Sequence, residues 1–138
     1  MTTSDGPTLV TGAGGFIGGH LVADLVAQGR VVRAVDQKPP EQWYQHTGGV
    51  DERVLDLSRS EACEDSVAGV SEVYNLAADM GGMGFIENNK ALCMLTVLIN
   101  THLLQAARGA GVERYFYASS ACVYAAGKQT ETAVVPLV

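Results

Sequence analysis

Short apolar runs alternate with longer amphipathic segments along the chain, and this alternation predicts the order of strands and helices. Apolar runs that end at glycine, aspartate or serine are typical of buried strands. The runs predicted as strands are 8–11, 31–35, 53–57, 72–77 and 114–119. The segments predicted as helices are 16–28, 58–68 and 88–108. Because strands that alternate with helices need crossover connections, we predict an α/β fold with parallel strands.

Loops are predicted where proline and glycine gather. Residues 37–50 hold two prolines and two glycines, and residues 79–87 are rich in glycine. Ser58 followed by Glu61 has the spacing of a capping box, so Ser58 is predicted to cap the second helix. Residues 125–138 show no clear periodicity.

A glycine-rich turn joins the first predicted strand to the first helix. Residues 11–18 read TGAGGFIG, with glycines spaced as GxxGxxG. In such a turn Gly12 makes the tight bend, Gly15 lets the backbone approach a pyrophosphate, and Gly18 allows close packing of helix on strand. The alternative is a turn without a ligand, but the flanking strand and helix favour a dinucleotide-binding loop.

Asp36 follows the second predicted strand, where a carboxylate can accept hydrogen bonds from the adenosine ribose. It would also repel a 2′-phosphate, so it favours NAD over NADP. The alternative for Asp36 is a residue that only ends a strand. Lys38, two positions further, is included among the expected cofactor-binding residues.

Composition excludes several other classes of protein. The 138 residues are 47% hydrophobic and 17% charged, which is typical of a folded domain. A net charge of -6 argues against nucleic acid as a partner. No uninterrupted apolar run reaches the roughly 18 residues of a membrane span, and the polar start predicts no secretory signal. Three cysteines without CxxC spacing and three scattered histidines predict no disulfide framework and no metal site, which fits the cytoplasm.

Four motifs together resemble the extended short-chain dehydrogenase/reductase family of NAD-dependent nucleotide-sugar epimerases and dehydratases. The motifs are TGAGGFIG, Asp56-Leu57, the NLAA of residues 75–78, and Ser119-Ser120. The resemblance implies one NAD-binding domain over residues 1–138. Its fold is expected to be a Rossmann-type, doubly wound parallel sheet with strand order 3-2-1-4-5.

The resemblance also implies which residues hold NAD. Asp56 and Leu57 would lie along the adenine, and residues 76–78 beside the ribose. The alternatives are that Asp56 only introduces a helix and that NLAA is ordinary strand packing. The expected cofactor-binding residues are Gly12, Gly15, Phe16, Ile17, Gly18, Asp36, Lys38, Asp56, Leu57, Leu76, Ala77 and Ala78.

Segments 73–86 and 115–124 resemble the branch of the family that epimerises GDP-mannose at C3 and C5. The resemblance implies a nucleotide-sugar substrate that contacts the glycine-rich loop GGMGFI. A mobile surface loop is the alternative, but this loop is too apolar for a simple solvated tip. The expected substrate-binding residues are Gly81, Met83, Ser120, Ala121 and Cys122.

Two of these residues are expected to be catalytic by the same resemblance. Ser120 would hydrogen-bond the C4 oxygen of the sugar while hydride leaves C4. Cys122 would act as acid and base at C3 and C5, where the C4 ketone makes the neighbouring C–H bonds acidic. The alternative for Cys122 is an inert packing thiol, which is the role expected for Cys63 and Cys93.

The Tyr-xxx-Lys pair on which the family depends is not recognised. Tyr124 and Lys128 have the spacing, but they follow Ser120 too closely, and Gly127 would weaken a helical turn between them. The chain is therefore expected to be the N-terminal part of an epimerase and inactive alone. The alternatives are a non-catalytic NAD-binding module, or a 4-epimerase or 4,6-dehydratase of a UDP- or dTDP-sugar.

The predicted helix over 88–108 is apolar almost all round, so one face can pack on the sheet while another lacks a cover. The last predicted strand would also leave an open sheet edge. We expect self-association, with a homodimer as the specific state. The alternative is that residues 134–138 fold back over the exposed surface.

Overall fold

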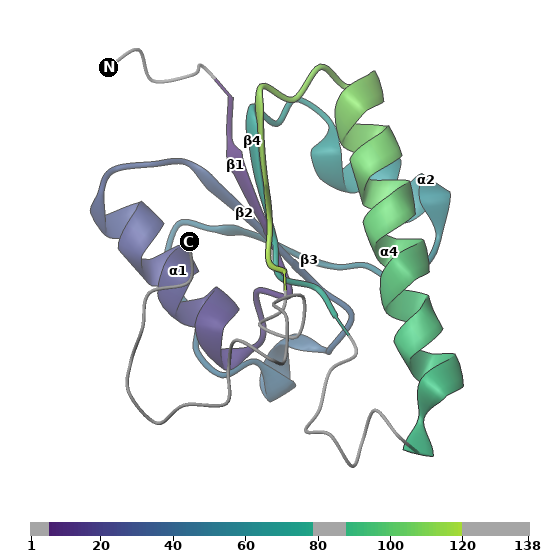
Figure 1. Ribbon diagram of the computed structural model, residues 1–138. Coiled ribbons are helices and arrows are strands. Elements are labelled where there is room, and N and C mark those ends of the chain that lie inside the picture. Colours follow the sequence, from purple (N-terminus) through teal and green to yellow (C-terminus); the bar gives the residue numbers. More distant parts are fainter. Residues whose placement is uncertain (1–5, 79–87, 120–138) are drawn as a thin grey trace, which may run out of the picture.

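The computed structural model describes residues 6–78 and 88–119, which form a five-stranded parallel sheet flanked by helices (Figure 1). The strand order is β3-β2-β1-β4-β5, so the predicted α/β fold and strand order are confirmed. The strands are β1 (Thr8–Thr11), β2 (Val32–Asp36), β3 (Asp51–Val54), β4 (Glu72–Asn75) and β5 (Arg114–Tyr117). The helices are α1 (Phe16–Ala27), the 3₁₀ turn η1 (Pro40–Gln42), α2 (Ser60–Val67) and α4 (Lys90–Gly109).

Helices cover both faces of the sheet: α1 lies on one face, and α2 and α4 lie on the other (Figure 1). Side chains alternate between the two faces along a strand, so neighbours on β1 belong to different layers. Leu9 packs with α2 and α4, whereas Val10 packs with α1. From α4, Leu103 and Ala107 are buried against the first of these layers. The central strand is thus buried on both faces, as expected of a parallel sheet.

The third strand, Asp51–Val54, begins two residues earlier and ends three residues earlier than the predicted 53–57. The backbone N–H of Leu55 donates to the Asp36 carbonyl at 3.0 Å, which is the last contact with β2 before the chain leaves the sheet. Leu57 lies in the loop after β3, and its side chain is buried in the core. The apolar run in the sequence extends past the strand because Leu57 is apolar for packing in the core and does not pair in the sheet.

The predicted capping box at Ser58 is wrong. The cap position of α2 is Arg59, and no side chain caps that helix. Ser58 instead donates from its hydroxyl and its backbone N–H to Asp56 Oδ1, at 2.7 and 3.0 Å. An aspartate that holds the residue two positions on forms an Asx turn, and this turn competes with the cap.

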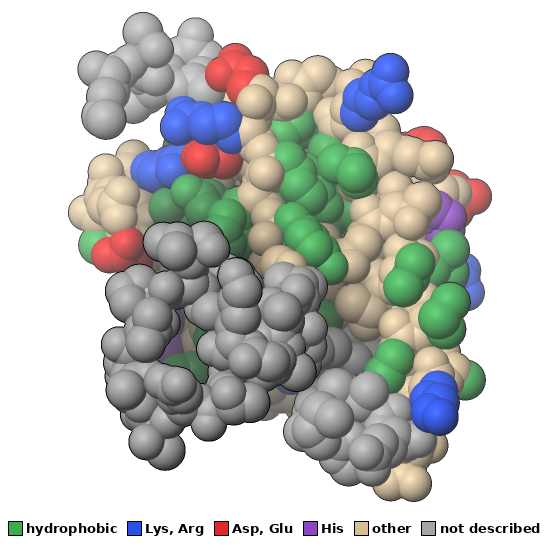
Figure 2. All heavy atoms as spheres, in the orientation of Figure 1, with side chains coloured by type: hydrophobic (Ala, Val, Ile, Leu, Met, Phe, Trp, Pro, Cys, Tyr) green, Lys and Arg blue, Asp and Glu red, His purple; other side chains and the backbone are tan. Residues whose placement is uncertain are grey.

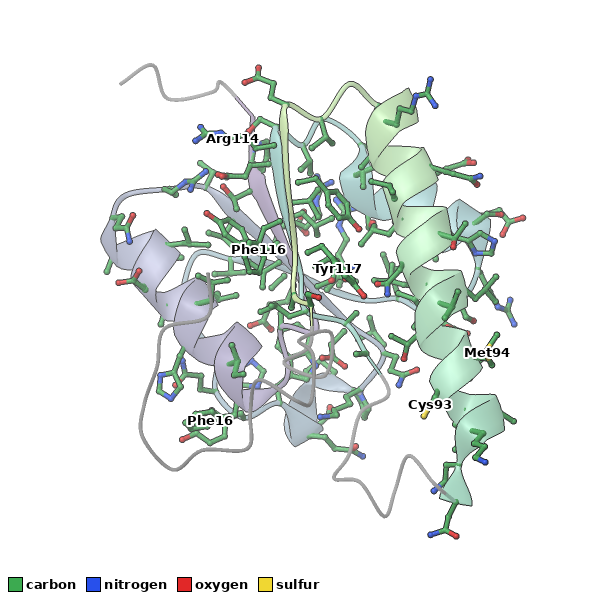
Figure 3. All side chains as sticks on the ribbon, viewed as in Figure 1. Phe16, Cys93, Met94, Arg114, Phe116 and Tyr117 are labelled. Carbon is green, nitrogen blue, oxygen red and sulfur yellow. The ribbon has the colours of Figure 1, made fainter. Side chains whose placement is uncertain are left out.

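Helix α4 exposes much of its apolar surface. Figure 2 shows hydrophobic side chains spaced along it, and Figure 3 shows Met94 pointing outward. The exposed apolar residues of α4 are Leu92, Met94, Leu95, Val97, Leu98 and Leu104. By length and composition alone α4 could cross a membrane, so the lack of an uninterrupted apolar run does not by itself exclude a span. Core helices of soluble proteins pass the same test, which makes this property weak support for a membrane location.

Candidate dinucleotide site

A cleft of about 310 Å³ lies at the carboxyl ends of the central strands, where ligands bind in open α/β sheets. The glycine-rich turn after β1, the end of β2, the segment after β3 and the residues after β4 form its walls, and α4 adds one side chain. The lining residues are Gly12, Gly15, Val35, Asp36, Gln37, Lys38, Leu55, Leu57, Leu76, Ala77, Ala78 and Ile99. Eight of the twelve expected cofactor-binding residues thus lie together.

The glycine-rich turn has little room for side chains. Gly12 has a φ of +69°, and a Cβ there would lie 2.7 Å from the Leu76 carbonyl oxygen. A Cβ at Gly18 would lie 2.2 Å from the Gly12 carbonyl oxygen, which explains how α1 packs so closely on the turn. At Gly15 a Cβ would meet only that same oxygen, at 3.2 Å. Packing therefore demands glycine at positions 12 and 18, whereas glycine at position 15 keeps the cleft open to a ligand.

Asp36 joins the glycine-rich turn to the end of β2. Its buried carboxylate accepts the Gly14 N–H through Oδ2 and the Lys38 N–H through Oδ1, both at 3.0 Å. These charge-assisted bonds fix the turn and the following loop on either side of the carboxylate. Since each oxygen has a further lone pair, Asp36 can also accept from a ligand in the cleft.

The cleft has an apolar side at Leu57, a residue predicted from the sequence motifs. Leu55 and Ile99 lie there as well, and Val35 and Gln37 complete the wall near β2. Nothing in the sequence marks Ile99, because it comes from a helix far along the chain and belongs to no motif. An apolar slot beside Asp36 suits a flat aromatic base next to a ribose.

Four expected cofactor-binding residues lie outside the lining. Phe16 and Ile17 begin α1 and are 61% and 70% exposed, while Gly18 packs behind the turn. Asp56 faces Ser58, whose hydroxyl and backbone N–H donate to its carboxylate and lower the pKa of that group. Among the substrate and catalytic expectations, Gly81, Met83, Ser120, Ala121 and Cys122 all lie outside the described residues.

A buried polar network lies beneath the cleft, where β1, β4, β5 and α4 meet. Thr11 donates its hydroxyl to Asn75 Oδ1 at 2.8 Å. The Asn75 amide donates to Asn100 Oδ1 at 2.8 Å and to the Tyr115 hydroxyl at 3.1 Å. Burial raises the pKa of Tyr115 to about 12, so this hydroxyl stays protonated. Asn75, the first residue of the NLAA motif, therefore joins three strands and a helix.

The cysteines in the described part of the chain are free. Cys63 is buried in the core, where burial raises the pKa of its thiol to about 11. A thiol with so high a pKa holds almost no thiolate at neutral pH and is a poor nucleophile. The geometry of Cys63 agrees with a packing role.

Comparison with known proteins identifies the family. A model of the NAD dependent epimerase/dehydratase family matches residues 8–137. The chain is 44% identical over 126 residues to GDP-mannose 3,5-epimerase 1 of Oryza sativa subsp. japonica, and 43% identical over 129 residues to GDP-mannose 3,5-epimerase of Arabidopsis thaliana. These matches cover 91% and 93% of this chain but 33% and 34% of the relatives. The chain thus spans about a third of the length of these relatives.

Two solved structures show the same fold. MoeE5 in complex with UDP-glucose and NAD is 38% identical, with a TM-score of 0.76 over 87% of this chain and 38% of that one. The UDP-glucose 4-epimerase of Thermus thermophilus, in complex with NAD, is 30% identical, with a TM-score of 0.68 over 79% and 36%. The resemblance expected from the sequence is confirmed, and so is its NAD dependence at the level of the family. The chain belongs to the NAD dependent epimerase/dehydratase family.

Proposed function

We propose that this chain supplies the NAD-binding part of an epimerase that acts on GDP-mannose at C3 and C5. The observation that carries the proposal is the cleft formed by Gly12, Gly15 and Asp36, in a chain 44% identical to a GDP-mannose 3,5-epimerase. NAD supplies reversible hydride transfer at C4 of the sugar in this chemistry. A single domain over residues 1–138 and a cytoplasmic location stay predictions.

The described residues fit a dinucleotide. Asp36 would accept hydrogen bonds from the adenosine ribose, and Leu57 and Ile99 would enclose the adenine. The N-terminus of α1, with Gly15 at its cap position and no side chain capping it, would face the pyrophosphate with the backbone N–H groups of its first turn. Phe16, Ile17, Gly18 and Asp56 would support this site from outside the lining.

Substrate residues are proposed from the sequence motifs. Gly81, Met83 and Ala121 would contact the sugar nucleotide. Ser120 would hydrogen-bond the C4 oxygen, and Cys122 would move protons at C3 and C5. Both catalytic candidates follow shortly after β5, whose carboxyl end shares an edge with those of β1 and β4.

A second candidate is an NAD-binding module without turnover. It is favoured by the sequence between Tyr124 and Lys128, where Gly127 weakens the only Tyr-xxx-Lys match. The chain should be incubated with NAD and GDP-mannose, UDP-glucose or dTDP-glucose, and the sugars followed by NMR. Epimerised GDP-mannose would overturn the expectation that this chain is inactive alone. Binding of NAD without any product would agree with that expectation. Reaction of the other sugars alone would contradict the GDP-mannose assignment.

Asp36→Ala should weaken NAD binding by on the order of tenfold, and NADP binding much less. The reason is that the carboxylate attracts the ribose hydroxyls of NAD but repels the 2′-phosphate of NADP. Calorimetric titration with both dinucleotides measures the two losses. Asp24→Ala, on the exposed side of α1, is the control. Equal losses of NAD and NADP binding would contradict this role of Asp36.

We also propose a homodimer through the exposed side of α4. Leu95 and Leu98 are 37% and 39% exposed, so they do not anchor the helix on the sheet. On β5, an edge strand of the described sheet, Phe116 and Tyr117 are exposed as well (Figure 3). Apolar surface of this kind is typical of contact with another protein.

Leu98→Glu should shift the chain toward monomer without unfolding it, because the new charge would be buried in a dimer but solvated in the monomer. Light scattering over a range of concentrations measures the state. Val31→Glu places the same charge at an exposed apolar position outside α4 and should leave the state unchanged. A concentration-independent monomer in the unsubstituted chain would contradict the proposal.

A further inference from the structure

The segment after β2 packs on the glycine-rich turn; we call residues 38–46 the strap, and its first residue, Lys38, also lines the cleft. Trp43 is buried, and its indole lies against Gly14, where a Cβ would come within 2.8 Å of the ring. The backbone N–H of Tyr44 donates to the Gly14 carbonyl at 3.0 Å. The indole N–H of Trp43 donates to the Lys38 carbonyl at 2.9 Å. The strap and the glycine-rich turn are therefore fixed to each other.

His46, the last residue of the strap, contacts residues at both ends of its neighbourhood: Trp43 and Pro40 in the strap, and Glu52 on β3. Its ring stacks on Trp43 with the centroids 5.8 Å apart and the planes 3° from parallel. Nδ1 lies 3.0 Å from a carboxylate oxygen of Glu52, and Nε2 lies 3.0 Å from the Pro40 carbonyl oxygen. Both partners can only accept hydrogen bonds. Because a neutral imidazole carries one N–H, only the doubly protonated ring satisfies both contacts.

We propose that His46 is a positioning residue for the dinucleotide cleft, and that its protonated ring holds the strap in the form that binds NAD. The inference rests on the proposed NAD binding. Protonated His46 joins η1 to β3 through Pro40 and Glu52, and its charge faces the indole of Trp43 in a cation–π contact. A neutral imidazole loses one of these two hydrogen bonds, and it also loses the cation–π contact with Trp43.

The contacts lead from His46 into the cleft. Trp43 contacts Gly14 directly and holds the Lys38 carbonyl. Gly14 and Lys38 both donate their backbone N–H to the Asp36 carboxylate. A strap that shifts at Trp43 therefore changes both hydrogen bonds that orient Asp36 toward the cleft.

The direction of the pH dependence follows from the charges around the ring. Glu52 of β3 and Glu41 of η1 face His46, and the hydrogen bond with Glu52 is the main cause that raises its pKa above the ordinary value. A raised pKa in the folded state means that the stabilisation is complete at acidic pH and is lost as pH rises through that pKa. NAD affinity should therefore fall as pH rises through the titration of His46.

The stack has its own spectroscopic readout, because Trp43 is the single tryptophan of the chain. A protonated imidazole in contact with an indole quenches its emission, so fluorescence should rise as His46 loses its proton. His46→Gln should remove this titration. Glu52→Gln should move its midpoint to lower pH, since the carboxylate that favours the charged ring is gone.

NAD affinity should then be measured by calorimetry at least one pH unit below and above the fluorescence midpoint. We expect the affinity of the unsubstituted chain to fall by about two- to fivefold at the higher pH. His46→Gln should bind with the weaker affinity at both values. His46→Arg keeps a flat, permanently charged group with several donors and should keep the stronger affinity at both. His102→Gln, on α4, is the control and should retain the pH dependence.

The outcomes separate this inference from the proposed function. NAD binding with the same affinity on both sides of the midpoint would overturn the role of His46 and leave the proposed function intact. Tryptophan emission that does not titrate, or that titrates equally in His46→Gln, would overturn the stack. Absence of NAD binding at every pH would overturn the proposed function and this inference together. Because the titration of the unsubstituted chain is informative alone, a variant that fails to fold does not remove the test.

Discussion

Gly18→Ala should destabilise the fold by about 3 kcal/mol or more and abolish NAD binding. The added Cβ would lie 2.2 Å from the Gly12 carbonyl oxygen and 2.8 Å from the Ala13 Cα. Both neighbours are backbone atoms of the turn that forms the cleft, so no side-chain rotation can relieve the clash. Either α1 moves away from the sheet or the turn unwinds. Urea unfolding and calorimetric titration with NAD measure the two effects.

Two other glycines are controls for Gly18→Ala. Gly15→Ala should destabilise the fold less than Gly18→Ala, because its Cβ meets only the Gly12 carbonyl oxygen, at 3.2 Å, but it should bind NAD poorly because that Cβ occupies the cleft. Gly109→Ala, at the end of α4, meets nothing within 4 Å and should change neither property much. A Gly18→Ala variant as stable as Gly109→Ala would show that α1 is not held as closely as described.

Asn75→Ala should cost about 3 kcal/mol of unfolding free energy, because it removes three hydrogen bonds at a buried position. The buried Thr11 hydroxyl and the partly buried Tyr115 hydroxyl would each lose this partner, and Asn100 would lose its donor. Unpaired polar groups cost more in a buried network than on the surface, since water cannot replace the missing partner. The free energy of unfolding in urea is the measurement.

Asn100→Ala is the matched comparison for Asn75→Ala. Asn100 lies on α4 and is only half-buried, so water can reach the groups it leaves and the expected cost is about 1 kcal/mol. A larger loss from Asn100→Ala than from Asn75→Ala would place the centre of the network on the helix and not on β4. Chemical denaturation of both variants under one condition decides the order.

Periodicity and glycine spacing predict most of the fold. The ends of α1 and β1 agree with prediction within one residue, since a glycine turn separates them and marks both boundaries. The ends of β3 do not agree, because Leu57 is apolar for the core and for the cleft rather than for the sheet. A sequence shows that a residue is apolar, but it does not show which of these surroundings requires it.

The residues of the site that have a local sequence signal could be predicted, and the others could not. Gly12 and Asp36 have local signals, a turn and a strand end, and both lie in the cleft. Ile99 reaches the cleft only because α4 folds back over the sheet, which no local pattern records. Trp43 and His46 lie in a predicted loop, where hydrophobic periodicity gives no information on side-chain positions. Their positions depend on contacts with Gly14 and Glu52.

Helix α4 faces the cleft and the solvent at once, and this has a consequence for any affinity measured on this chain. It places Ile99 in the lining and exposes Leu95 and Leu98 on another side. Association through the exposed side and ligand binding at the lining would act on one rigid element, and linkage makes any such influence mutual. Protein concentration is then a thermodynamic variable of every titration, and affinities measured on dilute and concentrated samples describe different species.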